Sequence, residues 1–401
     1  MRKRRISIAE VKLSPKAKKY VNSALNSNRL TYGPFTQKFE KQFSKLHDRK
    51  YAIFLNSGTS ALQVGLHAMK EKYGWNDGDE VLVPAVTFVS SANVVITNNL
   101  KPVFVDVEKD FYGIDPSSIE KHITKKTKAI MPVHLFGLPC DMTAITKIAR
   151  KHHLKIIEDS CETLFTNFKG RKAGSFGDVG CYSTYVAHII TSGVGGFATT
   201  DDNELAITMK SLMFHGRDNI YLNIDDDDKS NSKELFKIVD RRFNFIHVGY
   251  NFRLTEMESA LGLADLSQWK QIVKNRQKNG QFLTQHLAPF KDILQLPSIR
   301  KDSEHCFMLY PIVIKNKTIK RDDLIYFLEK NGIETRPMMP LVNQPVYKKM
   351  YGDIEDQYPV AKWINDNGFV IGCHHFLTND DLTYVVETFK RYFDSVKKLR
   401  V

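Results

Sequence analysis

A histidine stands beside a dense group of glycines in the segment 180–199, which reads GCYSTYVAHIITSGVGGFAT. Residues 180–185 and 196–199 have the β-branched and aromatic content of short buried strands. The run 192–196 between them is too rich in glycine for regular structure, and such a loop makes a tight corner or approaches a ligand closely. An imidazole such as His188 in this loop can act as a general base near neutral pH.

A second group of polar and aromatic side chains follows predicted strands, which is where ligands bind in parallel sheets. Each also has a purely structural reading. Asp159, at the end of KIIE, could cap a following turn; Phe88 could be a core aromatic residue, and Ser183 a half-exposed strand residue. The full set comprises Thr87, Phe88, His134, Asp159 and the segment 183–188.

The sequence NSGTSAL predicts a helix N-terminus after a short strand at 52–55. Gly58 and Thr59 lie in its first turn, where free backbone N–H groups and hydroxyls can bind an anion. An ordinary Ser or Thr N-cap explains the same residues.

These residues need a scaffold, and the pattern of short apolar runs alternating with helical ones predicts a mostly parallel sheet with helices on its faces. The expected elements are 81–83, 88–97, 103–105, 117–123, 129–133, 142–153 and 155–158. An N-terminal arm precedes them, with helices predicted at 14–27 and 35–46.

A long polar helix after about residue 270 leads into a smaller α+β region. There 307–313 is predicted to be a strand, 321–330 a helix and 334–337 extended chain. We therefore expect a large cofactor-binding domain with its arm over residues 1–270 and a small C-terminal domain over residues 271–401.

Several ordered motifs resemble those of the DegT/DnrJ/EryC1/StrS family of vitamin B6-dependent sugar aminotransferases. They are NSGTSAL, PVFVDV, PVHLFGLPCDM, EDSCE, the glycine-rich hairpin and GYNFR, and together they span the chain from about residue 25 into its C-terminal part. The resemblance implies the α/β PLP-transferase fold of type I. The family binds its cofactor through a lysine, but His188 stands at that position here. The chain is therefore most similar to the histidine-bearing branch of nucleotide-sugar 3-dehydratases, the GDP-4-keto-6-deoxymannose 3-dehydratase type.

The resemblance assigns roles around the cofactor, pyridoxamine or pyridoxal 5'-phosphate. It implies that Asp159 pairs with the pyridine nitrogen, where a carboxylate keeps the ring protonated and electron-accepting. It places Phe88 against one face of the ring and gives Ser183, with Gly58 and Thr59, to the phosphate.

Four further residues complete the set. Glu162 stands where aminotransferases of the family have glutamine. Asn251 would reach the phosphate in the neighbouring subunit, which implies a homodimer. Arg253 and Arg336 are expected to bind the sugar nucleotide, since a diphosphate suits the forked donors of arginine. No metal site is expected.

The activity implied is removal of the C3 hydroxyl of a nucleotide-diphosphate 4-keto-6-deoxy sugar, for the synthesis of deoxysugars in surface polysaccharides. Neutral His188 would take a proton from the cofactor's methylene carbon, and L-glutamate would recharge the cofactor. An aminotransferase with an atypical histidine is the alternative, although imidazole cannot form the covalent imine that lysine forms. A non-catalytic family member and an engineered lysine-to-histidine change also stay open.

Composition bounds the partners. The net charge is +13, but no nucleic-acid motif accompanies it, so a solvated basic surface or an anionic substrate explains the charge. No run of apolar residues is long enough to span a membrane, and the basic N-terminus lacks the apolar core of a secretory signal. Five dispersed cysteines indicate reduced thiols in the cytoplasm and no iron-sulfur cluster. The acidic run 225–228 is expected to be solvated.

Overall fold

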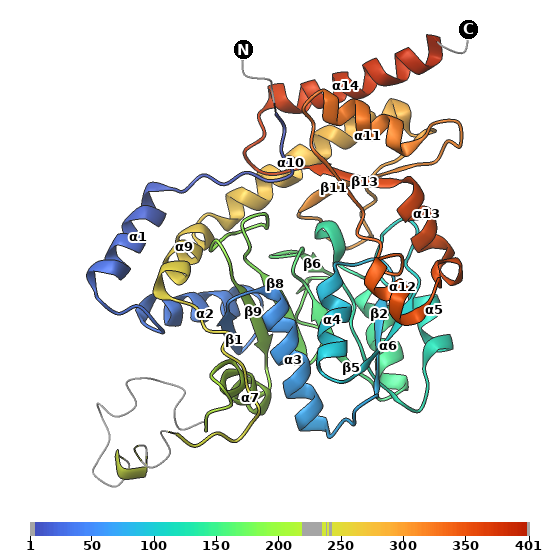
Figure 1. Cartoon of the computed structure of the whole chain (residues 1–401). Helices are drawn as coiled ribbons and strands as arrows, with labels where there is room; N and C mark the ends of the chain where they lie inside the picture. The colour runs from blue at the N-terminus through green and yellow to red at the C-terminus, as the bar shows by residue number, and fades with distance from the viewer. Residues whose placement is uncertain (1–4, 219–234, 238, 240–242, 399–401) are drawn as a thin grey trace.

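The computed structural model describes residues 5–218, 235–237, 239 and 243–398. The acidic run 225–228 lies outside the described residues. Figure 1 shows a large sheet with helices packed around it and a second, smaller layer of helices and strands above it.

The large sheet has seven strands in the order β1-β9-β8-β5-β4-β2-β3. β3, β2, β4, β5 and β8 are parallel neighbours, whereas β9 runs antiparallel to both β8 and β1. The mostly parallel α/β sheet expected from the sequence is confirmed. The strands are β1 Tyr51–Leu55, β2 Glu80–Pro84, β3 Lys101–Val105, β4 Thr127–Ile130, β5 Lys155–Asp159, β8 Val179–Ser183 and β9 Gly196–Thr200.

Helices cover the sheet and bury its strands; β2, β8 and β9 have no exposed residue. The helix α3 packs on β8 and β9 and begins where the Ser57 hydroxyl accepts the Ser60 N–H at 3.0 Å. It ends at Gly74, which takes the left-handed φ of 62° that glycine tolerates. The helices of this layer are α3 Gly58–Tyr73, α4 Val89–Thr97, α5 Pro116–Ile119, α6 Met142–Lys151 and α7 Asn203–Met213, and β6 Asn167–Phe168 pairs with β7 Arg171–Lys172 in a separate hairpin.

The N-terminal arm forms α1 Pro15–Asn26 and α2 Pro34–Leu46, close to the predicted bounds, and both pack on α9 Glu256–Leu266. The buried carboxylate of Glu256 accepts the backbone N–H groups of Gly33, Phe35 and Thr36 at 2.8 to 3.0 Å. These are the donors that the start of α2 leaves without intrahelical acceptors.

The smaller layer is built on a four-stranded sheet of order β10-β11-β13-β12, with antiparallel pairing throughout. Its strand β11 begins at Leu309, two residues after the predicted start, because Phe307 has a left-handed φ of 47°. The elements are α10 Trp269–Leu287, β10 Leu294–Gln295, β11 Leu309–Ile314, α11 Arg321–Lys330, β12 Thr335–Pro337, β13 Gly368–Gly372 and α14 Asn379–Lys398.

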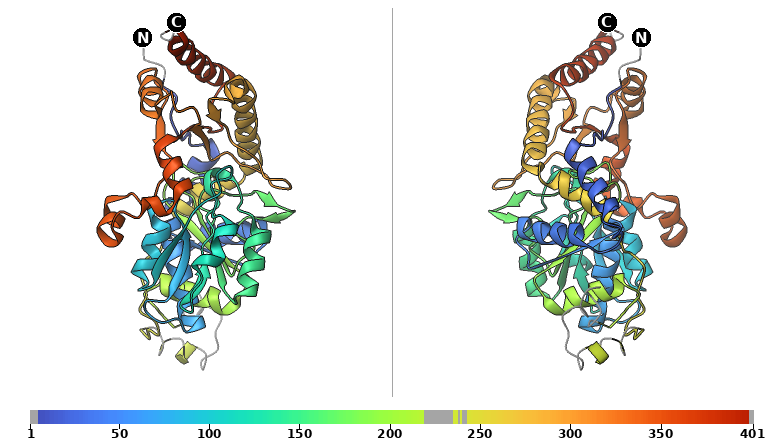
Figure 2. Two further views of the ribbon diagram at one scale, coloured as in Figure 1. Left: turned by 90° about the vertical axis from the view of Figure 1, so that its right-hand side faces the viewer. Right: turned by 90° about the vertical axis from the view of Figure 1, so that its left-hand side faces the viewer.

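Segments distant in sequence join the two layers. Ile6, near the N-terminus, bonds to the backbone of Gly332 and Glu334 and is buried in the core of the smaller layer. In the other direction, α12 Pro345–Tyr351 and α13 Pro359–Asn367 return to the large sheet. Figure 2 shows this red-orange segment along one side of the large layer. The division at residue 270 stays a prediction.

Candidate functional site

The loop 184–195 connects β8 to β9 and is held as a tight hairpin. The Thr184 N–H donates to Gly195 at 2.9 Å, the Val186 N–H donates to Gly193 at 3.0 Å, and the hydroxyls of Thr184 and Ser192 lie 2.6 Å apart. Gly193 and Gly195 take φ values of 86° and 152°, which only glycine adopts without strain. The glycines of the sequence motif therefore make the corner that positions His188.

His188 is half-buried, and its backbone N–H donates to Tyr185 at 2.9 Å. Its ring atom Nδ1 is buried and has no hydrogen-bond partner among the described residues. Burial and the positive charge of Arg276 lower the pKa of the imidazole to about 4. At neutral pH the ring is therefore uncharged and keeps a free electron pair.

Asp159 lies buried at the carboxyl end of β5. One carboxylate oxygen accepts the Ser91 hydroxyl at 2.8 Å, and the other accepts the Cys161 N–H at 3.1 Å. The second contact is the turn cap that the sequence allowed as an alternative, so the side chain does serve a local turn. Ser91 in turn contacts the Thr87 hydroxyl at 2.8 Å, which links the acid to the start of α4.

Phe88, next to Thr87, is not a core residue: its side chain is 59% exposed at the N-cap of α4. The alternative reading as a core aromatic is therefore wrong. An exposed aromatic ring beside the Thr87–Ser91–Asp159 chain is free to contact a ligand.

The start of α3 meets the end of β8 at the same edge of the sheet. A Cβ atom added to Gly58 would lie 2.8 Å from the Cys161 Sγ and 2.9 Å from the Ser183 Cβ, and one added to Gly196 would lie 2.5 Å from the Gly58 nitrogen. Ser183 is buried rather than half-exposed. Thr59 is exposed, and its N–H and that of Gly58 belong to the first turn of α3, which has no intrahelical acceptors for them.

Glu162 accepts the backbone N–H of Phe136 at 2.7 Å. Burial raises the pKa of its carboxyl to about 7, the Phe136 hydrogen bond opposes the rise, and the charge of Asp159 adds to it. Near neutral pH a large share of Glu162 therefore holds a proton and can donate a hydrogen bond.

The remaining predicted residues lie apart from this group. Asn251 is exposed and accepts the Arg253 Nε–H at 2.8 Å. Arg336 is exposed on β12, where it donates to its neighbour's carbonyl on Thr335 at 2.7 Å and forms an ion pair with Glu334. None of the three contacts His188 or Asp159 among the described residues.

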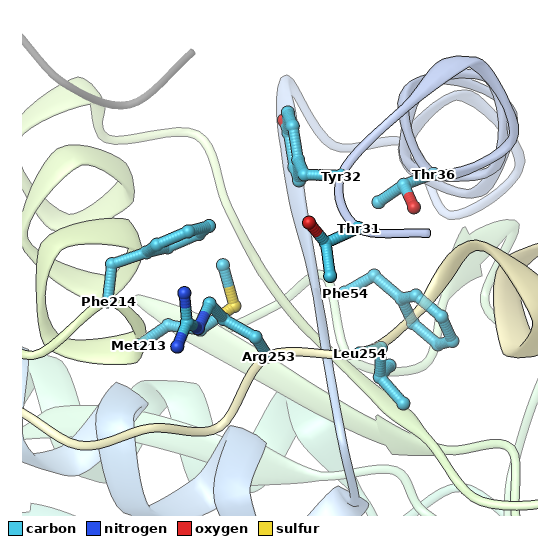
Figure 3. A pocket seen from close by; sticks show the side chains of 8 residues that line it. All are labelled: Thr31, Tyr32, Thr36, Phe54, Met213, Phe214, Arg253 and Leu254. Atoms are coloured by element: carbon cyan, nitrogen blue, oxygen red, sulfur yellow. The ribbon is translucent and has the colours of Figure 1, made fainter. Parts of the chain in front are cut away.

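Arg253 lines a surface pocket between the arm and the end of α7 (Figure 3). Its guanidinium lies 5.3 Å from the centre of the Phe214 ring. The pocket is lined by Thr31, Tyr32, Thr36, Phe54, Met213, Phe214, Arg253 and Leu254. A second pocket runs along α3 from Thr59 past Gln63 and is bordered by Tyr250 and Phe252, on either side of Asn251.

His134 follows β4 as expected, but it is fully buried and paired. The Cys140 N–H donates to its Nδ1 at 3.0 Å, so Nε2 carries the hydrogen and donates to Glu158 at 3.0 Å. This pair has no open side for a ligand, and we assign it a structural role.

Sequence reasoning missed two residues of the site. Ser91, which holds Asp159, is one of two adjacent serines in VSSANVV, and nothing in that string separates it from its neighbour. Arg276, whose guanidinium is buried beside the His188 loop, stands in a lysine-rich helix that is typical of a solvated surface.

A helix N-terminus, an acid and a base that meet at the carboxyl edge of a mostly parallel sheet define the α/β aminotransferase class, the PLP-transferase fold of type I. The chain belongs to the DegT/DnrJ/EryC1/StrS aminotransferase family, whose model matches residues 12–390. That family consists of vitamin B6-dependent enzymes that modify nucleotide-linked sugars.

Proteins similar to this chain include both synthases and dehydratases of GDP-linked sugars. The GDP-perosamine synthase of Caulobacter vibrioides is 34% identical over 385 residues, which cover 95% of this chain and 96% of that protein. The GDP-4-keto-6-deoxy-D-mannose 3-dehydratase of Escherichia coli O55:H7 is 29% identical over 378 residues, covering 93% of this chain and 96% of that protein. A solved structure of GDP-4-keto-6-deoxymannose-3-dehydratase with a trapped PLP-glutamate geminal diamine has a TM-score of 0.85 at 27% identity, covering 96% and 99% of the two chains.

Across the described residues, no helix is both long and apolar enough to cross a membrane. The same residues contain no group of three or more His, Cys, Asp or Glu side chains arranged to hold a metal ion. All five cysteines carry free thiols.

Proposed function

We propose that the chain is a PMP/PLP-dependent 3-dehydratase that removes the C3 hydroxyl of a nucleotide-linked 4-keto-6-deoxy sugar. The observation that carries this proposal is His188: an uncharged, partly buried imidazole with an unpartnered Nδ1 stands on the loop that would carry the family's lysine. An imidazole can remove a proton there but cannot bind the cofactor covalently.

The residues at this edge of the sheet fit a phosphorylated pyridine cofactor. The start of α3 offers N–H groups to an anion, and the backbone around Gly58 and Gly196 is so close-packed that no Cβ would fit. Asp159 is fixed through both of its oxygens, and Phe88 presents an exposed ring beside it. The unpartnered Nδ1 of His188 adds a group that needs a polar ligand.

When bound, the cofactor supplies an amine for the C4 ketone and a ring that accepts an electron pair. Asp159 would hold a proton on the ring nitrogen, with Ser91 and the Cys161 N–H keeping the carboxylate in place. Ser183, Gly58 and Thr59 would hold the phosphate.

His188 would act as the general base through the free electron pair on its ring, taking a proton from the cofactor's methylene carbon. Its neutral state at pH 7 follows from burial and from Arg276. Once protonated, the same imidazole would donate its proton to the departing C3 hydroxyl, which would leave as water. Exclusion of a lysine amine from this position favours loss of that hydroxyl over transfer of the amine to the sugar.

The nucleotide-diphosphate portion of the substrate would bind to Arg253 and Arg336. Both are exposed, and both are held by neighbouring acceptors, Asn251 and Glu334 respectively. Asn251 would contribute to the phosphate site of a partner subunit, and L-glutamate would recharge the cofactor. The dehydratase relative with a trapped PLP-glutamate species supports that choice of donor.

An aminotransferase is the second candidate, favoured by the 34% identity to a GDP-perosamine synthase. In that case C4 would gain an amine and the C3 hydroxyl would remain. A non-catalytic role is disfavoured because the chain keeps a fixed Asp159, the close packing of Gly58 on Ser183 and an unpartnered His188 Nδ1, which a role without turnover does not require.

One incubation separates these functions. The purified protein is mixed with pyridoxamine phosphate, glutamate and a panel of 4-keto-6-deoxy nucleotide sugars, and the sugar products are weighed. We expect a product lighter by one oxygen atom, with 2-oxoglutarate formed in step. A product that keeps its C3 hydroxyl and gains nitrogen identifies an aminotransferase, and no product with any sugar supports a non-catalytic member. Dehydration that ignores glutamate but starts with a reductase and NADH would overturn the glutamate assignment.

A further inference from the structure

Arg276 is a fully buried arginine in the middle of α10, with only 2% of its surface exposed. Its Nη1 donates to the backbone carbonyls of Phe307 at 3.2 Å and Met308 at 3.0 Å. Its Nη2 reaches the carbonyl of His188 at 3.5 Å, the longest of the three contacts. One guanidinium thus faces both the segment that leads into β11 and the turn that carries the proposed base.

The helix around Arg276 is fastened to the small sheet by further contacts. The Cys373 thiol donates to the Arg276 carbonyl at 3.7 Å, and the Asn279 amide donates to the His374 carbonyl at 2.9 Å. Gly280 packs so tightly on the Phe307 ring that an added Cβ would lie 2.5 Å from it. The packing of α10 on the small sheet therefore fixes the backbone from which the Arg276 side chain extends.

Besides Arg276, a residue of the helix α9 also forms a hydrogen bond to the loop 184–195. Asp265 of α9 accepts the Thr191 N–H at 2.8 Å. His188 lies between this anchor and the start of the loop, so its carbonyl is the point at which the small domain reaches the turn. Among the described residues, the Arg276 contact is the hydrogen bond that reaches the stretch 185–190 from outside its hairpin, in addition to the core packing of Ile189 and Ile190.

We propose that Arg276 is a positioning residue: its guanidinium ties the His188 turn to the smaller layer, and its fixed positive charge faces the proposed base from α10. This inference rests on the proposed role of His188 as the base. Arg276 is buried and its side chain bonds only to backbone carbonyls among the described residues, so we assign it an effect through His188.

Several groups around the imidazole of His188 set its electrostatic environment. Burial and Arg276 lower the pKa of His188, and the Tyr185 backbone contact raises it. Burial, and after it the Arg276 charge, also lowers the pKa of His374 to about 4 and that of His375 to about 3, so the two imidazoles after β13 stay neutral beside Arg276. Asp265 of α9 also interacts with the Arg276 charge, and burial raises the pKa of its carboxyl.

Nuclear magnetic resonance of the cofactor-free protein with labelled histidine tests the proposal without any turnover. The His188 signal is assigned with His188→Asn, and its pKa is measured in wild type, Arg276→Met and Arg276→Lys. We expect Arg276→Met to raise the His188 pKa by about one pH unit or more, because a fixed charge is removed from a buried site. Arg276→Lys keeps the charge and should leave the pKa low, while hydrogen exchange in 185–190 speeds up because the forked contacts are lost.

Arg49→Met is the matched control, since Arg49 is another buried arginine that donates to the carbonyls of Gly174 and Gly177. It should lower stability without moving the His188 pKa. In the assay, Arg276→Met should shift the acid limb of the kcat profile upward and lower kcat roughly tenfold, with KM little changed. If the Arg276→Met protein does not fold, hydrogen exchange of residues 185–190 in Arg276→Lys tests the proposal instead.

The proposal is overturned by a His188 pKa that stays unchanged in Arg276→Met, by an equal shift in Arg49→Met, or by unaltered exchange of 185–190 in Arg276→Lys. These readouts come from the apo protein. A failed dehydratase assay with the expected apo results would remove the proposed function and leave the Arg276 contact standing.

Discussion

Two titratable side chains near the site become uncharged at neutral pH by opposite routes. Burial lowers the pKa of His188, so the imidazole loses its proton at a lower pH than a free imidazole does. Burial also raises the pKa of Glu162, so this carboxyl keeps its proton to a higher pH than a free carboxyl does. Near neutral pH the candidate site thus contains an uncharged base and an acid of which about half is protonated, and both can exchange hydrogen bonds with a polar ligand.

The first prediction concerns Glu162. Its folded pKa of about 7 lies above the usual 4.5, so the folded chain holds a proton that the unfolded chain releases. Stability should therefore fall as pH rises from about 4.5 to 7, by roughly 2 kcal/mol. Glu162→Gln, which has no proton to lose, should flatten this slope and keep most of the activity, because it donates as protonated glutamate does. Urea unfolding of the apo protein across that pH range measures it. A slope that is the same in both proteins contradicts the assignment.

The second prediction is that the cofactor is not covalently bound. Borohydride should leave the wild-type chain unlabelled, because imidazole forms no reducible imine with an aldehyde. His188→Lys restores an amine at that position and should be fixed by the same treatment, which peptide mass spectrometry detects. A reduced pyridoxyl-lysine peptide from the wild-type protein would refute the claim, and an unlabelled His188→Lys protein would show that residue 188 does not face the cofactor.

At this scale the sequence predicted the residues that carry a motif and missed those that do not. His188, Asp159 and Ser183 could be named because the resemblance supplies their context, and the structure places them near one sheet edge. Arg276 and Ser91 act through backbone geometry and a neighbouring hydroxyl, which leave no pattern in a single sequence.

Among the elements, the start of α2 shows how one side chain can stabilise a junction. Glu256, on α9, accepts three backbone N–H groups and the Thr36 hydroxyl at the α2 N-terminus. A buried negative charge is favourable there because it faces the positive end of the helix dipole.

The third prediction follows from this cap. Glu256→Ala should lower the free energy of unfolding by about 3 kcal/mol, because several buried donors lose their acceptor at once. Glu256→Gln keeps one oxygen acceptor and should cost about half as much. Glu258→Gln is the control. The partly buried carboxylate of Glu258 accepts one N–H at the start of its own helix, from Thr255, so this substitution should lower the free energy of unfolding by less than Glu256→Ala does. Denaturant midpoints with equal slopes measure all three, and equal losses in all three would contradict the argument.

The elements themselves were predictable where the apolar period was regular. The arm helices and the sheet strands agree with the elements expected from the sequence. The start of β11 was placed too early because the left-handed backbone of Phe307 has no sequence signal in an aromatic residue.

On the surface of the molecule, a strip of exposed apolar residues leads to Asn251 and has the character of a protein–protein interface. Phe243 is 80% exposed and Val248 is 87% exposed, in the strip that leads to Asn251. Exposed apolar side chains in this density are typical of a surface that contacts another protein chain. We propose that this strip lies against a second copy, so that Asn251 completes the neighbour's phosphate site.

The fourth prediction tests this sharing. The Asn251→Ala and His188→Ala proteins should each be inactive alone, because both active sites of each variant homodimer lack the substituted residue. After exchange of subunits, half of the dimers are mixed, and one of the two sites in each is intact, so about a quarter of wild-type activity should return. Sedimentation confirms the dimer. Mixed dimers that form and stay inactive would rule out shared sites.

The sequence could not show how the two layers are tied together. Ile6 enters the core of the small layer, and α12 and α13 return to the large sheet, where the Tyr347 hydroxyl donates to Asn93 at 2.7 Å. Such long-range packing depends on the assembled shape rather than on any local period.

The hairpin between β8 and β9 has an evolutionary consequence. Residue 188 lies on a connection between adjacent antiparallel strands, so a mutation there changes no strand register and no crossover helix. Folding therefore constrains this codon weakly, whereas the proposed role of His188 as the base would constrain it strongly. Lysine and histidine codons are joined through glutamine or asparagine, and either intermediate would leave the backbone bonds of the loop intact. A duplicated gene could in this way exchange one sugar reaction for another before any other part of the protein had to diverge.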